Sequence, residues 1–386
     1  MKPQRLYNLD WLRVLVIINM IPFHTAWIMT FVEGFFKVPQ DGFIAQTMRL
    51  YVAFFTCWHM PLLFFISGVG TGLALNFRST GEYVRERIKR LLVPLLFFMV
   101  FCFPVLAYYW PAIVLEKSIT HFFFYFWPEI IKSIHYSDVT GGPGWAHLWF
   151  VAYLCIFSFI MLPIFLYLRK KRSRDIIAHF AVFFSRKGMI YLPGFLFVAI
   201  HALLSVKFPL CQNNLYTDWA YFSYNLTAFL LGYILCLDLQ FWKIIDERFR
   251  TALMIGVVTA SLVIVMWTII PAFSTPGYTL GYVVFSALFG FNTWIWMIAL
   301  LGLSRKYLNF TNGFLRYFNR ASYPIYIIHL VIITVIGYYV VEWRTGFVLE
   351  FILLTVFSFA AIIVCYELIK RTKITRFLFG MKGENT

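Results

Sequence analysis

Long apolar runs, separated by short polar and charged segments, set the pattern of hydrophobic and polar positions along this chain. A helix needs about 20 apolar residues to cross a hydrocarbon core about 30 Å thick. Ten stretches of suitable length follow one another, at residues 10–31, 48–75, 91–110, 146–168, 189–206, 219–237, 252–270, 279–302, 323–341 and 346–368. The pattern predicts an all-α, polytopic membrane protein with ten transmembrane helices.

The composition agrees with this prediction and leaves little room for anything else. Of the 386 residues, 61% are hydrophobic and only 13% are charged, which no soluble domain matches. The apolar runs fill most of the chain. We therefore expect a single membrane domain over residues 1–386 that ends in a short cytoplasmic tail at 377–386.

A formal net charge of +16 raises the question of a nucleic-acid partner, and the placement of the charges argues against one. If both termini are cytoplasmic, 26 of the 33 basic residues fall in segments on the inner side. Such an excess of Lys and Arg in cytoplasmic loops is the usual signature of membrane topology. The sequence RKKRSRD at 169–175 then serves as an orientation signal and lipid-headgroup anchor, and membrane lipid is the expected partner.

Several further features limit the class of protein. Five of the six cysteines lie in or at apolar runs without a CxxC pair, so we expect neither disulfides nor a metal site. The first apolar run is too long for a cleavable signal sequence, and we expect it to be retained as a span. A long outer segment, residues 111–145, ends in TGGPGWAHLW. It is either a cap over the bundle or a loop that grips a substrate.

Arg13 and His24 stand out in the first apolar run. Eleven residues at 100° each place both side chains on one helical face, about 16.5 Å apart along the axis. Ionisable groups at such depth usually face the bundle interior and mark a working site. In the structural interpretation, Arg13 pairs with Asp10 and His24 is a satisfied interior histidine beside Pro22. In the functional one, His24 is a general base and Arg13 faces an anionic ligand.

A second group of candidates runs from Phe64 to Pro94. Small residues, among them Ser67 and Gly68, would let a ligand or another helix approach closely. Arg87 and Arg90 are three residues apart and are expected to share a helical face. Because guanidinium groups bind phosphate oxygens in a bidentate manner, the pair could hold a phosphorylated ligand. A basic inner loop is also expected from topology alone.

The remaining candidates are aromatic and imidazole side chains. His147 and Trp149 begin the fourth apolar run, where Trp is often only an interfacial anchor. Tyr326 and His329, one turn apart in the ninth run, share a face and could hydrogen-bond across helices. His59, in the second run, is expected to be structural.

These motifs in this order resemble the acyltransferase 3 family of integral membrane O-acyltransferases. The resemblance is carried by LDWLR with Arg-x10-His in the first run, FFISG in the second, and R-x-x-R-L-x-x-P before the third, followed by HLWF and SYPIYIIH. Within the family, the chain looks closest to the branch that transfers succinyl groups to osmoregulated periplasmic glucans. The resemblance extends over almost the whole chain.

The resemblance implies transfer of an acyl group, acetyl or succinyl in class, from cytoplasmic acyl-CoA to a hydroxyl of an envelope carbohydrate or related acceptor. His24 and Arg13 map onto the family's essential His and Arg, and Arg87 and Arg90 onto its R-x-x-R pair. Ser67 and Gly68 would contribute to donor binding, and His147, Trp149, Tyr326 and His329 to substrate binding. Tyr326 is also a candidate donor to the oxyanion.

The same resemblance implies a place in the cell and a set of partners. We expect a multi-pass protein of the bacterial cytoplasmic, or inner, membrane, with other envelope-synthesis proteins as further candidate partners. Ten spans with buried His and Arg would also suit a transporter or exporter of an envelope glycan or lipid. A scaffold without catalytic activity is the third alternative.

Overall fold

The structure is a computed structural model that describes residues 5–31, 42–109, 145–208, 211, 213–275 and 277–381. All regular secondary structure in these residues is helical, which confirms the predicted all-α class for this part of the chain. The outer segment 111–145 falls outside the described residues except for Trp145, so its predicted role stays a prediction.

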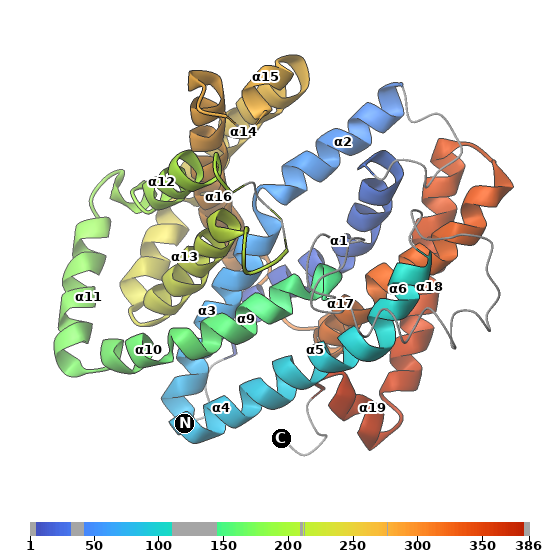
Figure 1. The fold of residues 1–386 in the computed structure, drawn as a ribbon. Helices are drawn as coiled ribbons and strands as arrows, with labels where there is room; N and C mark the ends of the chain where they lie inside the picture. The colour runs from blue at the N-terminus through green and yellow to red at the C-terminus, as the bar shows by residue number, and fades with distance from the viewer. Residues whose placement is uncertain are drawn as a thin grey trace. The chain divides into compact units, whose positions relative to one another are not determined.

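Figure 1 shows the course of the helices. In chain order they are α1 (Tyr7–Phe31), α2 (Phe43–Thr56), α3 (His59–Phe77), α4 (Thr80–Arg87), η1 (Ile88–Leu92), α5 (Val93–Phe97), η2 (Phe98–Cys102), α6 (Phe103–Tyr109), η4 (Ala146–Leu148), α9 (Trp149–Ile160), α10 (Leu162–Leu168), α11 (Lys171–Phe184), η5 (Met189–Tyr191), α12 (Gly194–Leu204), α13 (Trp219–Cys236), α14 (Leu239–Ile269), α15 (Pro271–Ser274), α16 (Leu280–Tyr307), α17 (Gly313–Val340), η6 (Val341–Trp343), α18 (Phe347–Ile369) and α19 (Lys373–Leu378).

Seven helical stretches among the described residues are long and apolar enough to cross a membrane. Two more candidates are bent pairs: Ala146–Ile160 meets Leu162–Leu168 at 52°, and Lys171–Phe184 meets Met189–Leu204 at 116°, which raises the number to nine if each pair is one span. Each predicted run overlaps one of these stretches except 219–237, which coincides with the 18-residue helix α13. The multi-pass character is confirmed, while the count of ten and the cytoplasmic termini stay predictions.

The chain divides into two compact units. The first unit comprises Met1–Arg13, Phe54–Arg85 and Tyr153–Arg316, and the second comprises Val14–Ala53, Glu86–Ala152 and Tyr317–Thr386. Both are made of segments that are far apart in the sequence. The prediction of one membrane domain over the whole chain stays a prediction.

Close helix packing holds the first unit together. There α3 lies against α13, as Figure 1 also shows, and α16 packs on both α12 and α14. A Cβ atom at Gly68 would lie 2.0 Å from the carbonyl oxygen of Phe229, and one at Gly232 would lie 2.1 Å from that of Phe65. Only glycine allows two membrane helices to approach this closely.

Two π-helical segments, both in the second unit, interrupt the helical stretch from α4 to α6. These are η1, just before Pro94, and η2, just before Pro104. A π turn carries one more residue than an α turn and often occurs at functional sites. The side chains on either side of each segment therefore do not follow the spacing of a regular α-helix.

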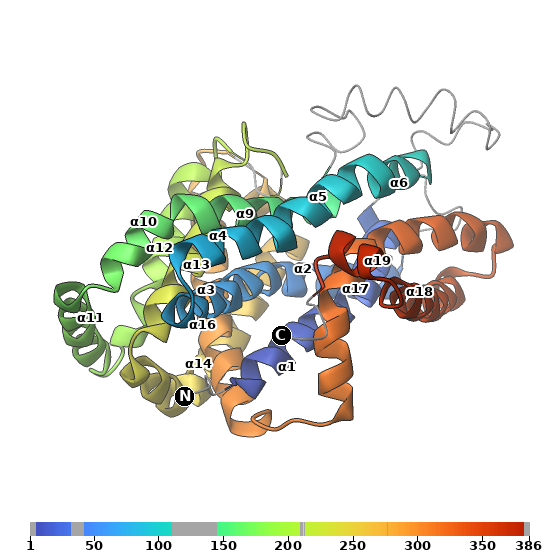
Figure 2. The same cartoon turned by 90° about the horizontal axis from the view of Figure 1, so that it is seen from below.

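Helix α19 and the residues that directly follow it, up to 381, pack within the second unit. Figure 2 shows α19 following α18 and lying near α17. The ring of Phe379 lies 5.3 Å from that of Phe97, and Gly380 adopts a φ of 62°, which favours glycine. The described part of the predicted tail, residues 377–381, is therefore attached to the helices.

Candidate active site

Three histidines from different helices lie together in the second unit: His24 of α1, His147 of η4 and His329 of α17. The ring centroids of His24 and His329 are 4.8 Å apart, and those of His147 and His329 are 4.7 Å apart. His147 and His329 are buried, and His24 is half-buried. Each was a candidate from the sequence, and we call the group the histidine cluster.

Hydrogen bonds within the cluster determine which nitrogen of His329 carries its proton. Nδ1 of His329 lies 2.7 Å from the carbonyl oxygen of Tyr326. Because a carbonyl oxygen only accepts hydrogen bonds, Nδ1 must be the protonated nitrogen, and in a neutral imidazole Nε2 is then an acceptor. We therefore assign the Nδ1–H tautomer to His329.

This assignment fixes the tautomer of His24 in turn. Nε2 of His329 lies 3.2 Å from Nδ1 of His24, which also lies 3.0 Å from the carbonyl oxygen of Met20. Both neighbours are acceptors, so Nδ1 of His24 must donate to them. The lone pair of the His24 ring consequently lies on Nε2, the nitrogen that a general base or nucleophile would use.

His147 and Tyr326 hold each other in place. Nε2 of His147 donates to the carbonyl oxygens of Tyr326 and Ile327, at 3.1 and 3.2 Å. The hydroxyl of Tyr326 donates to the carbonyl oxygen of His147. That bond would have to break before Tyr326 could serve as the predicted oxyanion donor. Phe98, in the π segment η2, packs edge-on against His147 at 5.1 Å.

Both nitrogen atoms of His329, Nδ1 of His24 and Nε2 of His147 contact one another or backbone carbonyls, whereas Nδ1 of His147 is buried without a hydrogen-bond partner in the part of the chain that the structure describes. Among the described residues, no group of three or more His, Cys, Asp or Glu side chains is arranged to hold a metal ion. The cluster is therefore best described as a hydrogen-bonded chain that ends at Nε2 of His24.

Arg13 lies on the same helix as His24, in the part of α1 that belongs to the first unit. Its guanidinium forms an ion pair with Asp10 at 2.8 Å, and Asp10 also binds Arg5 at 2.7 Å. The pair with Asp10 is the contact that the structural interpretation predicted. The essential role that the family resemblance implies for Arg13 stays a prediction.

Arg87 and Arg90 fall on either side of a change in helix type. Arg87 ends α4, whereas Arg90 lies in η1, so their shared face cannot be inferred from α-helical spacing. Arg90 binds Glu86 at 3.4 Å, and its Nε donates to the carbonyl oxygen of Gly380 at 3.3 Å. The backbone at Gly380, just after α19, thus holds the Arg90 guanidinium.

The other predicted site residues have structural surroundings of their own. Ser67 and Gly68 belong to the first unit, where the Ser67 hydroxyl donates to the carbonyl of Leu63 at 2.8 Å and Gly68 packs on α13. Trp149 is buried at the start of α9. His59 lies 2.6 Å from the Phe55 carbonyl, a contact in keeping with its expected structural role.

Glu350 is a buried ionisable residue that was not predicted as a site residue. This carboxyl group is fully buried in the first turn of α18, where the helix dipole favours a negative charge. The signal was present, because Glu350 is the one charged residue in the apolar run FVLEFILL. Ionisable side chains within membrane helices often mark functional sites.

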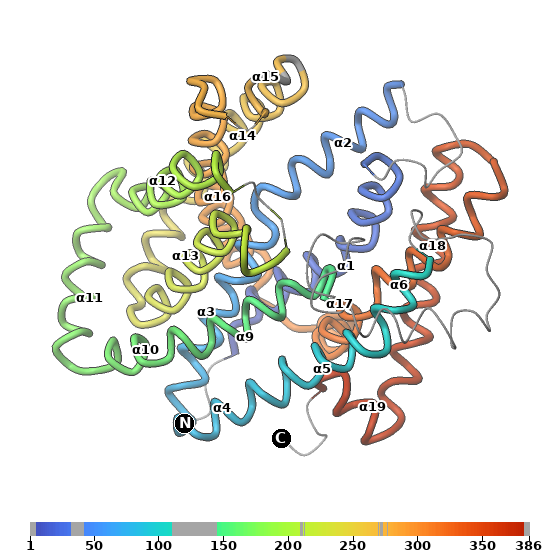
Figure 3. The backbone as a smooth tube through the Cα atoms, viewed as in Figure 1, coloured from blue at the N-terminus to red at the C-terminus, as the bar shows by residue number. Residues whose placement is uncertain are grey.

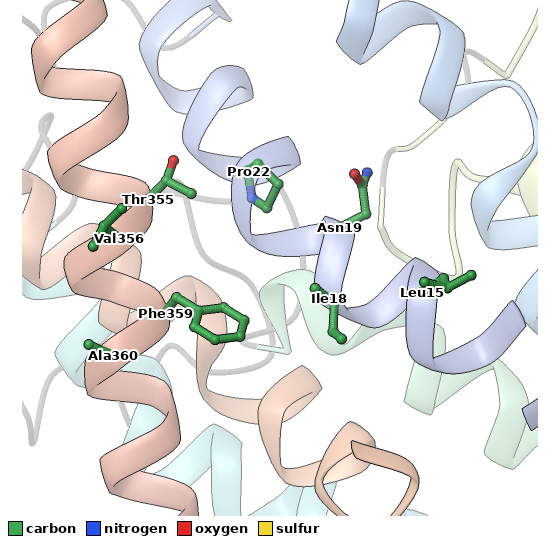
Figure 4. Close-up of a pocket in the computed structure, with 8 residues that line it drawn as sticks. All are labelled: Leu15, Ile18, Asn19, Pro22, Thr355, Val356, Phe359 and Ala360. Atoms are coloured by element: carbon green, nitrogen blue, oxygen red, sulfur yellow. The ribbon is translucent and has the colours of Figure 1, made fainter. Parts of the chain in front are cut away.

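A groove between α1 and α18, also in the second unit, has a volume of about 570 Å³. Figure 4 shows its lining, with Leu15, Ile18, Asn19 and Pro22 from α1 facing Thr355, Val356, Phe359 and Ala360 from α18. At 100° per residue, the α1 residues point away from the face that carries His24. The groove and the histidine cluster are therefore on different faces of α1.

Comparison with known proteins gives a consistent result over nearly the whole chain. The family described as acyltransferase domain matches residues 6–367. Glucans biosynthesis protein C of Salmonella schwarzengrund is 21% identical over 392 aligned residues, which cover 98% of this chain and 95% of that protein. The proteins of the same name from Salmonella paratyphi A and Salmonella agona match equally well. No solved structure matches the chain.

Proposed function

Because this chain belongs to the acyltransferase family that matches residues 6–367, we propose that it moves an acyl group of the acetyl or succinyl class from cytoplasmic acyl-CoA to a hydroxyl of an envelope carbohydrate. Membership in this family confirms the resemblance inferred from the motifs and makes the protein a membrane-embedded transferase of acyl groups. The donor, the acceptor and the inner-membrane location are the parts that we propose.

The observation that carries the proposal is the pair of contacts at Nδ1 of His24, which assigns the lone pair of the ring to Nε2. An acceptor hydroxyl is a weak nucleophile until a base removes its proton, and a histidine with an unprotonated Nε2 is suited to that task. The bond from Nδ1 of His24 to His329 keeps the proton off Nε2. The same bond would stabilise the imidazolium that forms when Nε2 accepts a proton.

The reaction then proceeds in two steps. Nε2 of His24 takes the hydroxyl proton while the oxygen attacks the thioester carbonyl, which gives a tetrahedral intermediate. The intermediate collapses with cleavage of the carbon–sulfur bond, and the imidazolium returns its proton to the departing thiolate. The products are the O-acyl ester and the free thiol of coenzyme A. Attack by Nε2 itself, through an acyl-imidazole, is the alternative order of events.

The basic residues support a donor that carries phosphates. Arg87 and Arg90 lie near the predicted inner surface, and guanidinium groups match phosphate oxygens. Arg13 precedes His24 by eleven residues of α1, or about 16.5 Å along the helix axis, and would contact the donor at that distance from the base. A donor with a long arm would be needed to span that distance.

The acceptor class rests on the relatives. Glucans biosynthesis protein C is named for glucan synthesis, and a glucan is a polymer rich in hydroxyl groups. We therefore propose a glucan-like carbohydrate that enters from the outer side, past His147 and Trp149. A succinyl donor is the first choice, because the motifs look closest to the succinyl-transferring branch.

The first experiment replaces His24 by Ala and by Gln. Membranes that contain the full chain, acyl-CoA and envelope glycan should release free thiol, and both variants should lose about 10²- to 10⁴-fold in rate, the usual share of a general base. His59→Gln is the matched control, because His59 contacts the Phe55 carbonyl and is expected to be structural, so its replacement should change the rate little.

Two results would contradict the proposal. If folded, membrane-inserted His24→Ala protein released thiol at the normal rate, His24 would not be the base. If the parent protein released no thiol but moved glycan unaltered across the membrane, it would be an exporter. Mass spectrometry of envelope glycans from a deletion strain, complemented with either the parent or the His24→Gln chain, identifies the acyl group and the acceptor.

A further inference from the structure

The helix α11 differs from the apolar helices around it. Figure 3 shows the chain turning sharply at both of its ends, and its axis makes an angle of 116° with the following segment Met189–Leu204. If that segment crosses the bilayer, as its apolar sequence predicts, α11 is closer to parallel with the membrane plane than to the membrane normal.

Two different faces run along α11. Ser173, Ile177 and Ala181, spaced by four residues, are buried. Next to this stripe, Ile176, Phe180 and Phe183 are 49%, 55% and 36% exposed. Large apolar side chains on an exposed helical stripe are unfavourable in water and favourable in hydrocarbon. One side of the helix thus packs against the protein, and the adjacent side is suited to contact with an apolar medium.

The start of α11 and the residues just after its end are basic. Lys170, Lys171, Arg172 and Arg174 surround the start of α11, Arg186 and Lys187 follow its end, and Asp175 is the one acidic residue in this segment. None of these cations forms an ion pair with any acidic side chain that the structure describes.

The basic residues at the start of α11 lie at an unfavourable end of the helix. The first turn of a helix carries a partial positive charge, so cations there are disfavoured unless a negative group lies outside the protein. Here the first turn of α11 holds basic residues and no acidic one.

We propose that α11 lies in the membrane interface and binds the headgroups of anionic phospholipids. Ile176, Phe180 and Phe183 enter the boundary of the acyl chains, and the basic residues at both ends contact lipid phosphates. An amphipathic helix with a basic polar face and bulky apolar residues binds to anionic bilayers in this way. The partner is the bilayer surface, and the inference is independent of the proposed function.

The test uses the full chain in lipid nanodiscs, made of phosphatidylcholine alone or of phosphatidylcholine with phosphatidylglycerol. The parent protein should unfold at a higher temperature in the anionic discs, because a lipid that binds only the folded state stabilises it. The variant Lys171→Gln, Arg172→Gln, Arg174→Gln should lose more than half of this shift. Native mass spectrometry should show a matching loss of retained phosphatidylglycerol.

The control removes the same charge elsewhere. Arg248→Gln, Arg250→Gln, Lys306→Gln, also on the predicted inner side, should keep most of the shift. An equal loss in both variants would show that overall charge alone is responsible, and an unchanged shift in the α11 variant would show that α11 does not bind the lipid. Either result overturns the proposal.

A last experiment distinguishes binding of lipid phosphates from binding of the phosphates of the acyl donor. The α11 variant should keep the parent's KM for acyl-CoA, whatever acyl group is used. If its KM rose while the lipid shift stayed intact, the basic residues would serve the donor and the lipid proposal would be wrong. Binding of acyl-CoA by titration gives the same comparison if no activity is found.

Discussion

A histidine has two nitrogen atoms, and its neighbours decide which of them is free to react. In this protein the Tyr326 carbonyl determines the tautomer of His329, and His329 in turn determines the tautomer of His24. None of these groups is charged in the assigned tautomers. A chain of neutral groups suits a membrane interior, because burial of an isolated charge there costs free energy.

The role of His329 can be tested by what replaces it. His329→Ala removes the acceptor for Nδ1 of His24, and the loss of a hydrogen bond of about 0.5–1.5 kcal/mol should lower kcat by about two- to tenfold. His329→Gln can place an amide oxygen near the position of Nε2 and should restore part of the rate. Steady-state kinetics over a range of pH should also show a changed pH profile for the Ala variant.

A purely structural His329 would give another pattern. Both variants would then unfold at a lower temperature, with no rescue by Gln and an unchanged pH profile. That outcome would leave His24 without a positioning partner.

The sequence predicts the candidate site residues, but not the contacts between them. The depth of His24 and the shared face of Tyr326 and His329 follow from helical periodicity, and both are local properties. The hydrogen bond between His24 and His329 depends on how α1 and α17 pack, which periodicity does not specify. The binding of Arg90 to Gly380 was missed for the same reason.

At the scale of helices, two glycines of α3, Gly68 and Gly70, can be compared by their effect on stability. Gly68→Ala places a methyl group 2.0 Å from a backbone oxygen of α13, so the two helices must separate. Overpacking of this kind should lower the free energy of unfolding by about 1–3 kcal/mol. Thermal unfolding followed by size-exclusion chromatography should show a lower midpoint.

Gly70→Ala is the matched control in the same helix. A Cβ atom at Gly70 meets no other atom within 4 Å, and alanine favours helix over glycine. Its midpoint should be unchanged or higher. If Gly68→Ala were as stable as Gly70→Ala but had a raised KM for the donor, the glycine would act in donor binding, as the sequence predicted.

Helices were predicted more reliably than their irregularities. Apolar length alone locates most of the spans, because the bilayer requires that length. It does not reveal the π segments η1 and η2 or the turn that separates α11 from α12. Those features depend on contacts with other helices and on polar residues whose placement the apolar count ignores.

At the scale of the whole molecule, the orientation in the membrane can be measured with a native residue. Cys211 is exposed, whereas the other five cysteines are buried or half-buried. It lies in a segment that the charge pattern places outside. A membrane-impermeant maleimide should therefore label intact spheroplasts at Cys211, and Cys211→Ser should abolish the labelling.

The opposite side needs an added cysteine. In the Cys211→Ser background, Thr386→Cys should be labelled only after the membrane is permeabilised, because the C-terminus is expected in the cytoplasm. Labelling of Thr386→Cys in intact spheroplasts would show that the assigned orientation is inverted.

The bond between His24 and His329 joins residues 305 positions apart, and this separation has a consequence for biosynthesis. At about 5–20 residues per second, roughly 15–60 s pass between the synthesis of the two rings. During that time α1 is in the bilayer without the partner that fixes its tautomer. The proposed base is therefore among the first residues made and among the last to gain its hydrogen-bond partner, and a ribosome that stalls before α17 leaves His24 without His329.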